Sequence, residues 1–188
     1  SLGRLETEKN HSFLIDVAIQ LKKDGVRFKL LIGGSGSLYE HLKSRVETNQ
    51  LDDDVYFVGF VKTPKDFYKS GDVLLLPSLY EGFGFVIIEA AANKIPVVAF
   101  DNSSKPEIVK QNSTGILTPD NDVEEFSNAI KKLYFDRDLT AKMGENAYSF
   151  TKDLFSIDEI NLKIEKYLIQ GFERRISAIV TTYNSDPK

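Results

Sequence analysis

The chain has 188 residues, of which 41% are hydrophobic and 28% charged, and its formal net charge is −4. This length favours one domain with at most a short remainder, and it is enough for a hydrophobic core without disulfides or structural metal. The acidic balance argues against nucleic-acid binding, which requires a basic surface. No apolar run approaches the ~20 residues of a membrane-spanning helix. The absence of cysteine excludes thiolate chemistry and cysteine-bound zinc.

Short apolar, β-rich runs alternate with stretches of helical spacing over the first two thirds of the chain. In chain order we expect a helix at 11–23, then strands at 28–32, 55–58, 73–76, 97–100 and 115–117, separated by helices at 38–48, 64–69, 86–93 and 107–111. Strands that are apolar on both faces and separated by helices pair in parallel through right-handed crossovers. The sequence therefore predicts an α/β fold with a Rossmann-like parallel sheet flanked by helices.

The pattern changes after Leu117. Three amphipathic helices are predicted at 123–134, 140–152 and 157–172, with Asp120, Asp122 and Ser156 as candidate caps. The segment 174–188 differs again, because a β-branched run at 176–184 follows two arginines. That run indicates a final strand, a disordered end or the start of another domain. We therefore expect one domain at 1–173 with a helical C-terminal segment, followed by a linker or strand at 174–188.

A glycine-rich loop, Gly33-Gly34-Ser35-Gly36, follows the first predicted strand and precedes a helix. Such a loop lets backbone amides and a helix N-terminus approach a phosphate. Because the last glycine of the G-x-G-x-x-G pattern is missing, a tight strand-to-helix turn is the preferred interpretation. Direct phosphate contact is the alternative, and it makes Gly34 a candidate ligand-binding residue.

The strongest candidate site lies between the third predicted strand and the helix that starts near Phe85. The connecting loop carries Glu81 and Gly82-Phe83-Gly84, and Glu89 lies about one turn into the helix. Glycine permits backbone conformations and close approaches that a Cβ would block, and a helix start offers free N–H groups and a positive dipole end to a diphosphate. The two carboxylates then suit sugar and ribose hydroxyls. Acidic residues favoured by the helix dipole are the alternative; it accounts for Glu81 but not for the glycine pair or for Glu89.

Other polar residues carry weaker signals. Arg4 and Lys9 beside a strand end suit a departing diphosphate, although solvated surface is the commoner role of such cations. We expect His11 and His41 at the surface, and the aromatic residues Phe57, Phe60, Phe67 and Tyr68 in the core. Lys105-Pro106-Glu107 after two serines predicts a capped helix start. No cluster has metal-ligand spacing, so we expect no bound metal.

Together these motifs resemble the C-terminal, donor-binding half of the retaining group 1 glycosyltransferases (family 4, GT-B fold). The ordered matches are Gly3-Arg4-Leu5 with Lys9, Ile32–Gly36, Val55-x-Phe57-x-Gly59, Tyr68-x-x-x-Asp72, Pro77-Ser78 with Glu81–Gly84 and Glu89, Pro96–Ala99, Pro106–Ile108 and Gly115–Leu117. They cover about residues 1–150. The two glutamates separated by seven residues are the most specific element.

The resemblance implies a role for each candidate residue. Arg4 and Lys9 would hold the diphosphate and assist its departure. Glu81 would contact the donor sugar beside the backbone of Gly82–Phe85, and Glu89 would bind the ribose. The base would lie against the backbone of two further residues, Phe60 and Val61.

The chain departs from the family at two loops. Asn93-Lys94-Ile95 stands where the family usually has a small glycine, and Ser103-Ser104-Lys105 replaces a glycine-rich turn. Glu107 follows this second loop and is a further candidate near the sugar.

The resemblance also implies partners and a reaction. The donor would be a UDP-, GDP- or ADP-sugar, transferred with retention and without a tightly held metal. The acceptor, a glycan or lipid-linked molecule, would be bound mainly by an N-terminal domain that this chain lacks, since the chain begins where the first strand of the second domain should be ending. We therefore expect weak nucleotide binding and no transfer by this chain alone. We expect a cytoplasmic enzyme of polysaccharide biosynthesis, with contact to the inner membrane face left open.

Two further interpretations stay open. The run at 176–184 resembles the opening strand of an inverting, GT-A-type glycosyltransferase of family 2, which would make the full protein a tandem enzyme. Half of a sugar-nucleotide epimerase, or a non-catalytic nucleotide-binding domain, is the alternative to a transferase.

Overall fold

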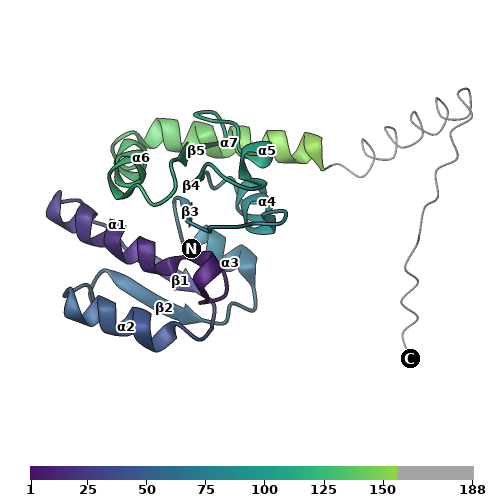
Figure 1. Cartoon of the computed structure of the whole chain (residues 1–188). Helices are drawn as coiled ribbons and strands as arrows, with labels where there is room; N and C mark the ends of the chain where they lie inside the picture. Colours follow the sequence, from purple (N-terminus) through teal and green to yellow (C-terminus); the bar gives the residue numbers. More distant parts are fainter. Residues whose placement is uncertain (156–188) are drawn as a thin grey trace, which may run out of the picture. The chain divides into compact units, whose positions relative to one another are not determined.

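The computed structural model describes residues 1–155, and residues Ser1–Lys152 form one compact unit (Figure 1). The strands are β1 (Leu30–Gly33), β2 (Val55–Gly59), β3 (Leu74–Leu76), β4 (Val97–Phe100) and β5 (Gly115–Thr118). The helices are η1 (Thr7–Lys9, 3-10), α1 (His11–Lys23), α2 (Tyr39–Thr48), α3 (Pro64–Lys69), α4 (Phe85–Ala92), α5 (Lys105–Ile108), α6 (Val123–Phe135) and α7 (Arg137–Leu154). The predicted alternation of strands and helices is confirmed. The largest differences are at α5, which begins and ends earlier than predicted, and at α7, which begins earlier and ends later than predicted.

All strand pairs are parallel, as predicted, but they form two sheets. β1 pairs with β2, while β4 lies between β3 and β5. The first residues of the chain run along β1 in parallel, because Leu2 forms a bridge with Gly33 and the Ser1 ammonium donates to the Leu31 carbonyl at 2.8 Å. An apolar cavity of about 540 Å³ is lined by residues of both sheets and of α1, α3 and α6.

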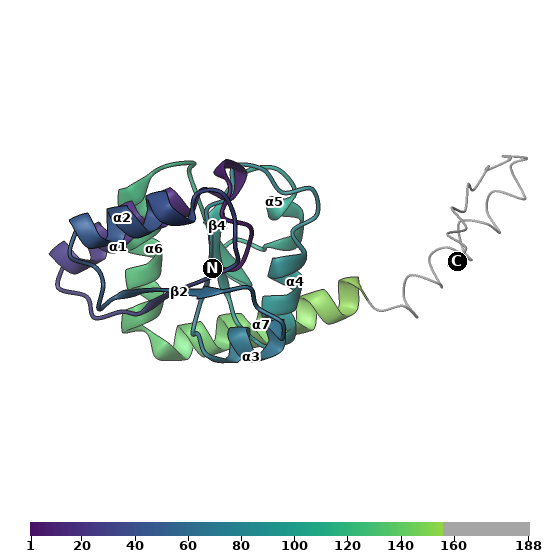
Figure 2. The same cartoon turned by 90° about the horizontal axis from the view of Figure 1, so that it is seen from below.

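The core is built by α1 and α6 against the strands. Phe13 of α1, Phe100 of β4 and Phe126 of α6 meet edge to face, with ring centroids 4.8–5.8 Å apart. Such aromatic contacts add about 0.5–1.5 kcal/mol each to the burial of the rings. α1 also packs against α2 (Figure 1). Figure 2 shows α1 and α6 on one side of the strands, and α4 and α5 on the other.

Helix starts in this unit follow local chemistry. Asp122 caps α6, because its side chain accepts a hydrogen bond from the Glu125 N–H at 2.9 Å. This is the arrangement that satisfies a free amide at a helix N-terminus.

No helix in the described part of the chain is long and apolar enough to span a bilayer. The helix predicted at 157–172, its cap Ser156, the domain boundary at 173 and the run at 176–184 lie outside the described residues.

Candidate functional site

The loop between β3 and α4 holds Glu81 in a largely buried position. α4 begins at Phe85, as predicted, and is preceded by Gly84 with φ 75°, in the left-handed region where glycine is favoured. The expected need for glycine is thus confirmed at Gly84. Gly82 has no left-handed φ, and a Cβ added to it would meet no atom of the chain within 4 Å, so the expected close approach of a ligand there stays a prediction.

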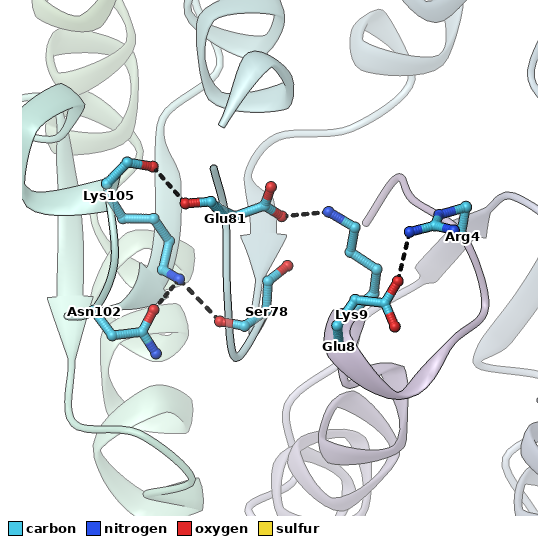
Figure 3. A network of polar contacts seen from close by, with 8 residues as sticks. Arg4, Glu8, Lys9, Ser78, Glu81, Asn102 and Lys105 are labelled. Atoms are coloured by element: carbon cyan, nitrogen blue, oxygen red, sulfur yellow. Dashed lines mark hydrogen bonds and ion pairs between the residues drawn. The ribbon is translucent and has the colours of Figure 1, made fainter. Parts of the chain in front are cut away.

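Lys9 and Glu81 come together from distant parts of the sequence. Lys9 Nζ lies 2.7 Å from Glu81 Oε1, although the residues are 72 positions apart, and their side chains are only 19% and 9% exposed. The Leu79 N–H also donates to the Glu8 carbonyl at 2.9 Å, which joins η1 to the β3–α4 loop. Figure 3 shows the Lys9 ammonium pointing at the Glu81 carboxylate. The two regions singled out in the sequence therefore form one site.

Arg4 lies near this pair but does not contact it. Its guanidinium binds Glu8 Oε1 at 2.7 Å, and its side chain is 74% exposed. In Figure 3 the Lys9 ammonium lies between the Glu81 and Arg4 side chains. An exposed cation at the edge of the site is free to turn toward an anion, because such a surface pair contributes only about 0–1 kcal/mol.

The glycine-rich loop has a structural reason for its composition. Gly34 has φ 132° and donates its N–H to the Gly59 carbonyl at 2.7 Å, and a Cβ on it would lie 1.8 Å from the Gly3 carbonyl oxygen. Three chain segments therefore cross at Gly34. Their close approach explains the glycine there and agrees with the predicted strand-to-helix turn. Val61 lies beside the same loop, since its Cγ2 would be 2.8 Å from a Cβ on Gly33.

Phe60 corrects a prediction about the core. Its side chain is 76% exposed, because the chain leaves β2 at Gly59 with φ 70° and turns away from the sheet. Phe60 therefore belongs to the surface next to the glycine-rich loop. Two other aromatic residues, Phe83 and Phe85, are also exposed, and their ring centroids lie 4.9 Å apart.

Glu89 lies on the exposed side of α4 and is held by a buried tyrosine. The Tyr68 hydroxyl, from α3, donates to Glu89 Oε2 at 2.9 Å. Burial, together with this carboxylate, raises the pKa of the Tyr68 phenol above its usual value, so the phenol stays a donor. Glu107 is exposed on α5. The structure thus brings Lys9 and Glu81 together. It pairs Glu89 with Tyr68, which the sequence predicted to lie in the core.

A buried lysine was missed by sequence reasoning. Lys105 has no exposed surface, and its ammonium donates to the Ser78 carbonyl at 2.9 Å and to Asn102 Oδ1. The Ser104 hydroxyl donates to the Glu81 carbonyl at 3.0 Å instead of capping α5. The predicted serine cap is therefore wrong, although Pro106 does occupy the first turn. Lysine is rarely buried, so no local signal predicts this arrangement.

His11 is also buried, contrary to prediction, and His41 is exposed as expected. Only 1% of His11 is accessible, and its Nδ1 has no hydrogen-bond partner among the described residues. Burial, the nearby Ser1 ammonium and Lys9 lower the pKa of His11 to about 4. The imidazole is therefore neutral at pH 7.

The two loops that depart from the family pattern keep a glycine-like backbone. Lys94 has φ 60° and Ser103 has φ 52°, both in the left-handed region. Within residues 1–155, no three His, Asp or Glu side chains gather as a metal site would require. Positive charge around Glu81 comes from Lys9 and Lys105, and the loop that carries Glu81 leads into the N-terminus of α4.

Comparison with known proteins identifies the family. A profile of the family described as Glycosyl transferases group 1 matches residues 1–150. The chain belongs to this family. Group 1 membership supports a role in glycosyl transfer and confirms the resemblance seen in the motifs. The proposed likeness of 176–184 to family 2 enzymes falls outside the match and stays a prediction.

Relatives of known name are glycosyltransferases. The alpha-D-kanosaminyltransferase of Streptomyces kanamyceticus is 31% identical over 150 residues, which are 78% of this chain and 38% of that protein. Curated relatives such as this one are much longer, and the chain spans 26–45% of the lengths of the first four.

Solved structures with the GT-B fold share this architecture. S. aureus TarM in complex with fondaparinux, alpha-GlcNAc-glycerol and UDP superposes with a TM-score of 0.81 at 29% identity, over 89% of this chain and 34% of TarM. Anabaena HepE in complex with UDP-glucose gives 0.76 at 25% identity, over 90% and 48%. The C-terminal domain of the group 1 protein LpcC from Francisella tularensis gives 0.74 at 25% identity, over 83% and 85%.

Proposed function

We propose that this chain is the donor-binding lobe of a retaining glycosyltransferase that takes its sugar from a nucleoside diphosphate sugar. The observation that carries the proposal is the Lys9–Glu81 pair at the start of α4. It brings a cation from η1 next to the carboxylate of the loop that leads into the N-terminus of α4. The match to an isolated C-terminal domain, that of LpcC, over 85% of its length supports the assignment to the second lobe of a GT-B enzyme.

The charges suit the two ends of such a donor. Glu81 would accept hydrogen bonds from the sugar hydroxyls, while Lys9 and the first amides of α4 would bind the diphosphate. Arg4 would leave Glu8 and add a second cation. Placing fixed positive charge where negative charge develops on the leaving group is the main means of electrostatic catalysis. We expect no tightly held metal, because side chains and helix amides would supply this charge.

Glu89 is the candidate for the ribose. Tyr68 occupies one of its carboxylate oxygens, which fixes the carboxylate and leaves the other oxygen for ribose hydroxyls. The base would lie against the exposed backbone near Phe60 and Val61, beside Gly34. The solved structures with UDP and UDP-glucose support a uridine nucleotide as the first ligand to test.

Transfer with retention needs no protein nucleophile in this proposal. The bond between the anomeric carbon and the diphosphate oxygen breaks, and a bond to the acceptor oxygen forms on the same face of the sugar. The acceptor proton passes to the departing phosphate. The acceptor, a glycan or lipid-linked molecule, would bind mainly to a second lobe, so we expect this chain by itself to bind donor and not to transfer sugar.

Calorimetry of the 188-residue chain with UDP, GDP and ADP tests the proposal. We expect one of these nucleotides to bind at or below millimolar concentration. Glu89→Ala should weaken that binding by about 1–3 kcal/mol, the value of a hydrogen bond to a charged group. Glu47→Ala on α2 is the matched control and should change nothing. Absence of binding by all three nucleotides to a chain whose circular dichroism shows it folded would refute the proposal.

A further inference from the structure

Two neighbouring residues at the start of α5 hold the loop that carries Glu81. The Lys105 ammonium binds the carbonyl of Ser78, and the Ser104 hydroxyl binds the carbonyl of Glu81. Asn102 accepts a further bond from Lys105 and donates to Asp120 Oδ2 at 2.7 Å, which ties the same network to the end of β5. Figure 3 shows Lys105 and Asn102 on the side of the loop opposite Lys9.

We propose that Lys105 and Ser104 act as a backbone clamp that positions Glu81 for the donor sugar. The inference rests on the proposed function, because it assumes that the Glu81 carboxylate contacts the sugar. Lys105 is a positioning residue and not a catalytic one, since its ammonium is fully covered by the chain.

The chemistry of the clamp suits this role. Both of its hydrogen bonds to the loop go to main-chain carbonyls, so neither uses the Glu81 carboxylate. Lys9 occupies Oε1, and within the described residues Oε2 has no partner. The carboxylate is therefore held from behind by the clamp and from the side by Lys9, with one oxygen available to a hydroxyl. Positioning of this kind matters because misplacement by about 1 Å costs ~100-fold in rate.

Stability alone does not account for a lysine at this place. Transfer of an ammonium out of water is costly, and an apolar side chain of similar volume is often as good or better in a buried position. The cost is visible in the pKa of Lys105, which burial lowers. A buried charge that binds the Ser78 carbonyl of this loop, next to a hydroxyl that binds the Glu81 carbonyl, is better explained by the geometry that the two bonds impose on the loop.

Two measurements test the proposal: hydrogen exchange reports the order of the loop that carries Glu81, and calorimetry reports recognition of the sugar. Lys105→Met keeps the volume and removes the charge, and Ser104→Ala removes the other bond. In the chain without nucleotide, amide hydrogen exchange at residues 79–84 should accelerate in both variants, by roughly tenfold for Lys105→Met. In calorimetry, Lys105→Met should weaken the binding of UDP-glucose by roughly tenfold, because Glu81 would no longer be held in position for the sugar. It should leave the affinity for UDP unchanged.

Two further comparisons make the outcome decisive. On a Glu81→Gln background, Lys105→Met should no longer change the ratio of UDP-glucose to UDP affinity. Lys110→Met, an exposed lysine just after α5, is the matched control and should alter neither readout. Equal losses for UDP and UDP-glucose, or a loss that persists with Glu81→Gln, would overturn the clamp.

The measurements give a different result if the proposed function is wrong. A folded parent chain that binds neither UDP nor UDP-glucose would refute the proposed function, and the clamp would then stand or fall on the exchange of residues 79–84. Unchanged exchange in Lys105→Met overturns it. If Lys105→Met does not fold, Ser104→Ala carries the same two measurements.

Discussion

His11 links the charge state of one buried side chain to the stability of the unit. Its pKa is about 4 in the folded chain against 6.5 for free histidine. Between these values the unfolded chain binds a proton that the folded chain does not, so stability is present above pH 6.5 and falls as the pH drops toward 4. A difference of this size amounts to about 3 kcal/mol.

We expect a loss of stability at low pH that the substitution His11→Phe removes. Urea unfolding of His11→Phe should show a smaller fall in the free energy of unfolding between pH 6.5 and 4 than the parent chain. His41→Phe, at an exposed position on α2, should keep the parent's slope. Identical slopes for His11→Phe and the parent would show that the imidazole does not titrate on unfolding.

At the scale of elements, the turn between β4 and α5 keeps a left-handed residue without glycine. Ser103 has φ 52°, a conformation in which a Cβ is disfavoured. Ser103→Gly should therefore raise the free energy of unfolding by about 0.5–1 kcal/mol. Ser104→Gly should lower it, because φ at Ser104 is −79° and its hydroxyl binds Glu81. Thermal unfolding of both variants measures the difference; destabilisation by Ser103→Gly would contradict the argument.

At the scale of the whole unit, the cavity lined by both sheets is a candidate site for an added strand. It is apolar, and Ser1 lies at its wall with a buried ammonium whose pKa burial lowers to about 5. Five residues appended before Ser1 would extend by ~16 Å as a strand and replace this ammonium with a peptide bond. Leu30 and Leu74, from the two sheets, are both among the lining residues.

An appended Val-Ile-Leu-Ile-Val should therefore stabilise the unit, because side-chain burial offsets the entropy of ordering and the buried amino terminus is removed. A Gly-Ser-Gly-Ser-Gly extension is the control and should have little effect. Urea unfolding gives the free energies, and slower hydrogen exchange of the β1 and β3 amides would locate the added strand. Equal stability of the two extensions would show that the cavity does not accept a strand.

The sequence by itself determined the elements and their order. Helix and strand periods are local, so the bounds of α1 and β4 agree with prediction, and the ordered motifs identified the family over residues 1–150. The need for glycine at Gly84, just before α4, was predictable for the same reason, because backbone sterics act within a few residues.

Only the tertiary structure decided which of these residues meet and which are covered. Lys9 reaches Glu81 because η1 folds onto the β3–α4 loop. Lys105 and His11 are buried because segments distant in the sequence cover them. Phe60 became exposed for the converse reason, since the chain turns away from the sheet at Gly59. Burial and pairing depend on contacts between residues far apart in the sequence, and a one-dimensional pattern does not contain them.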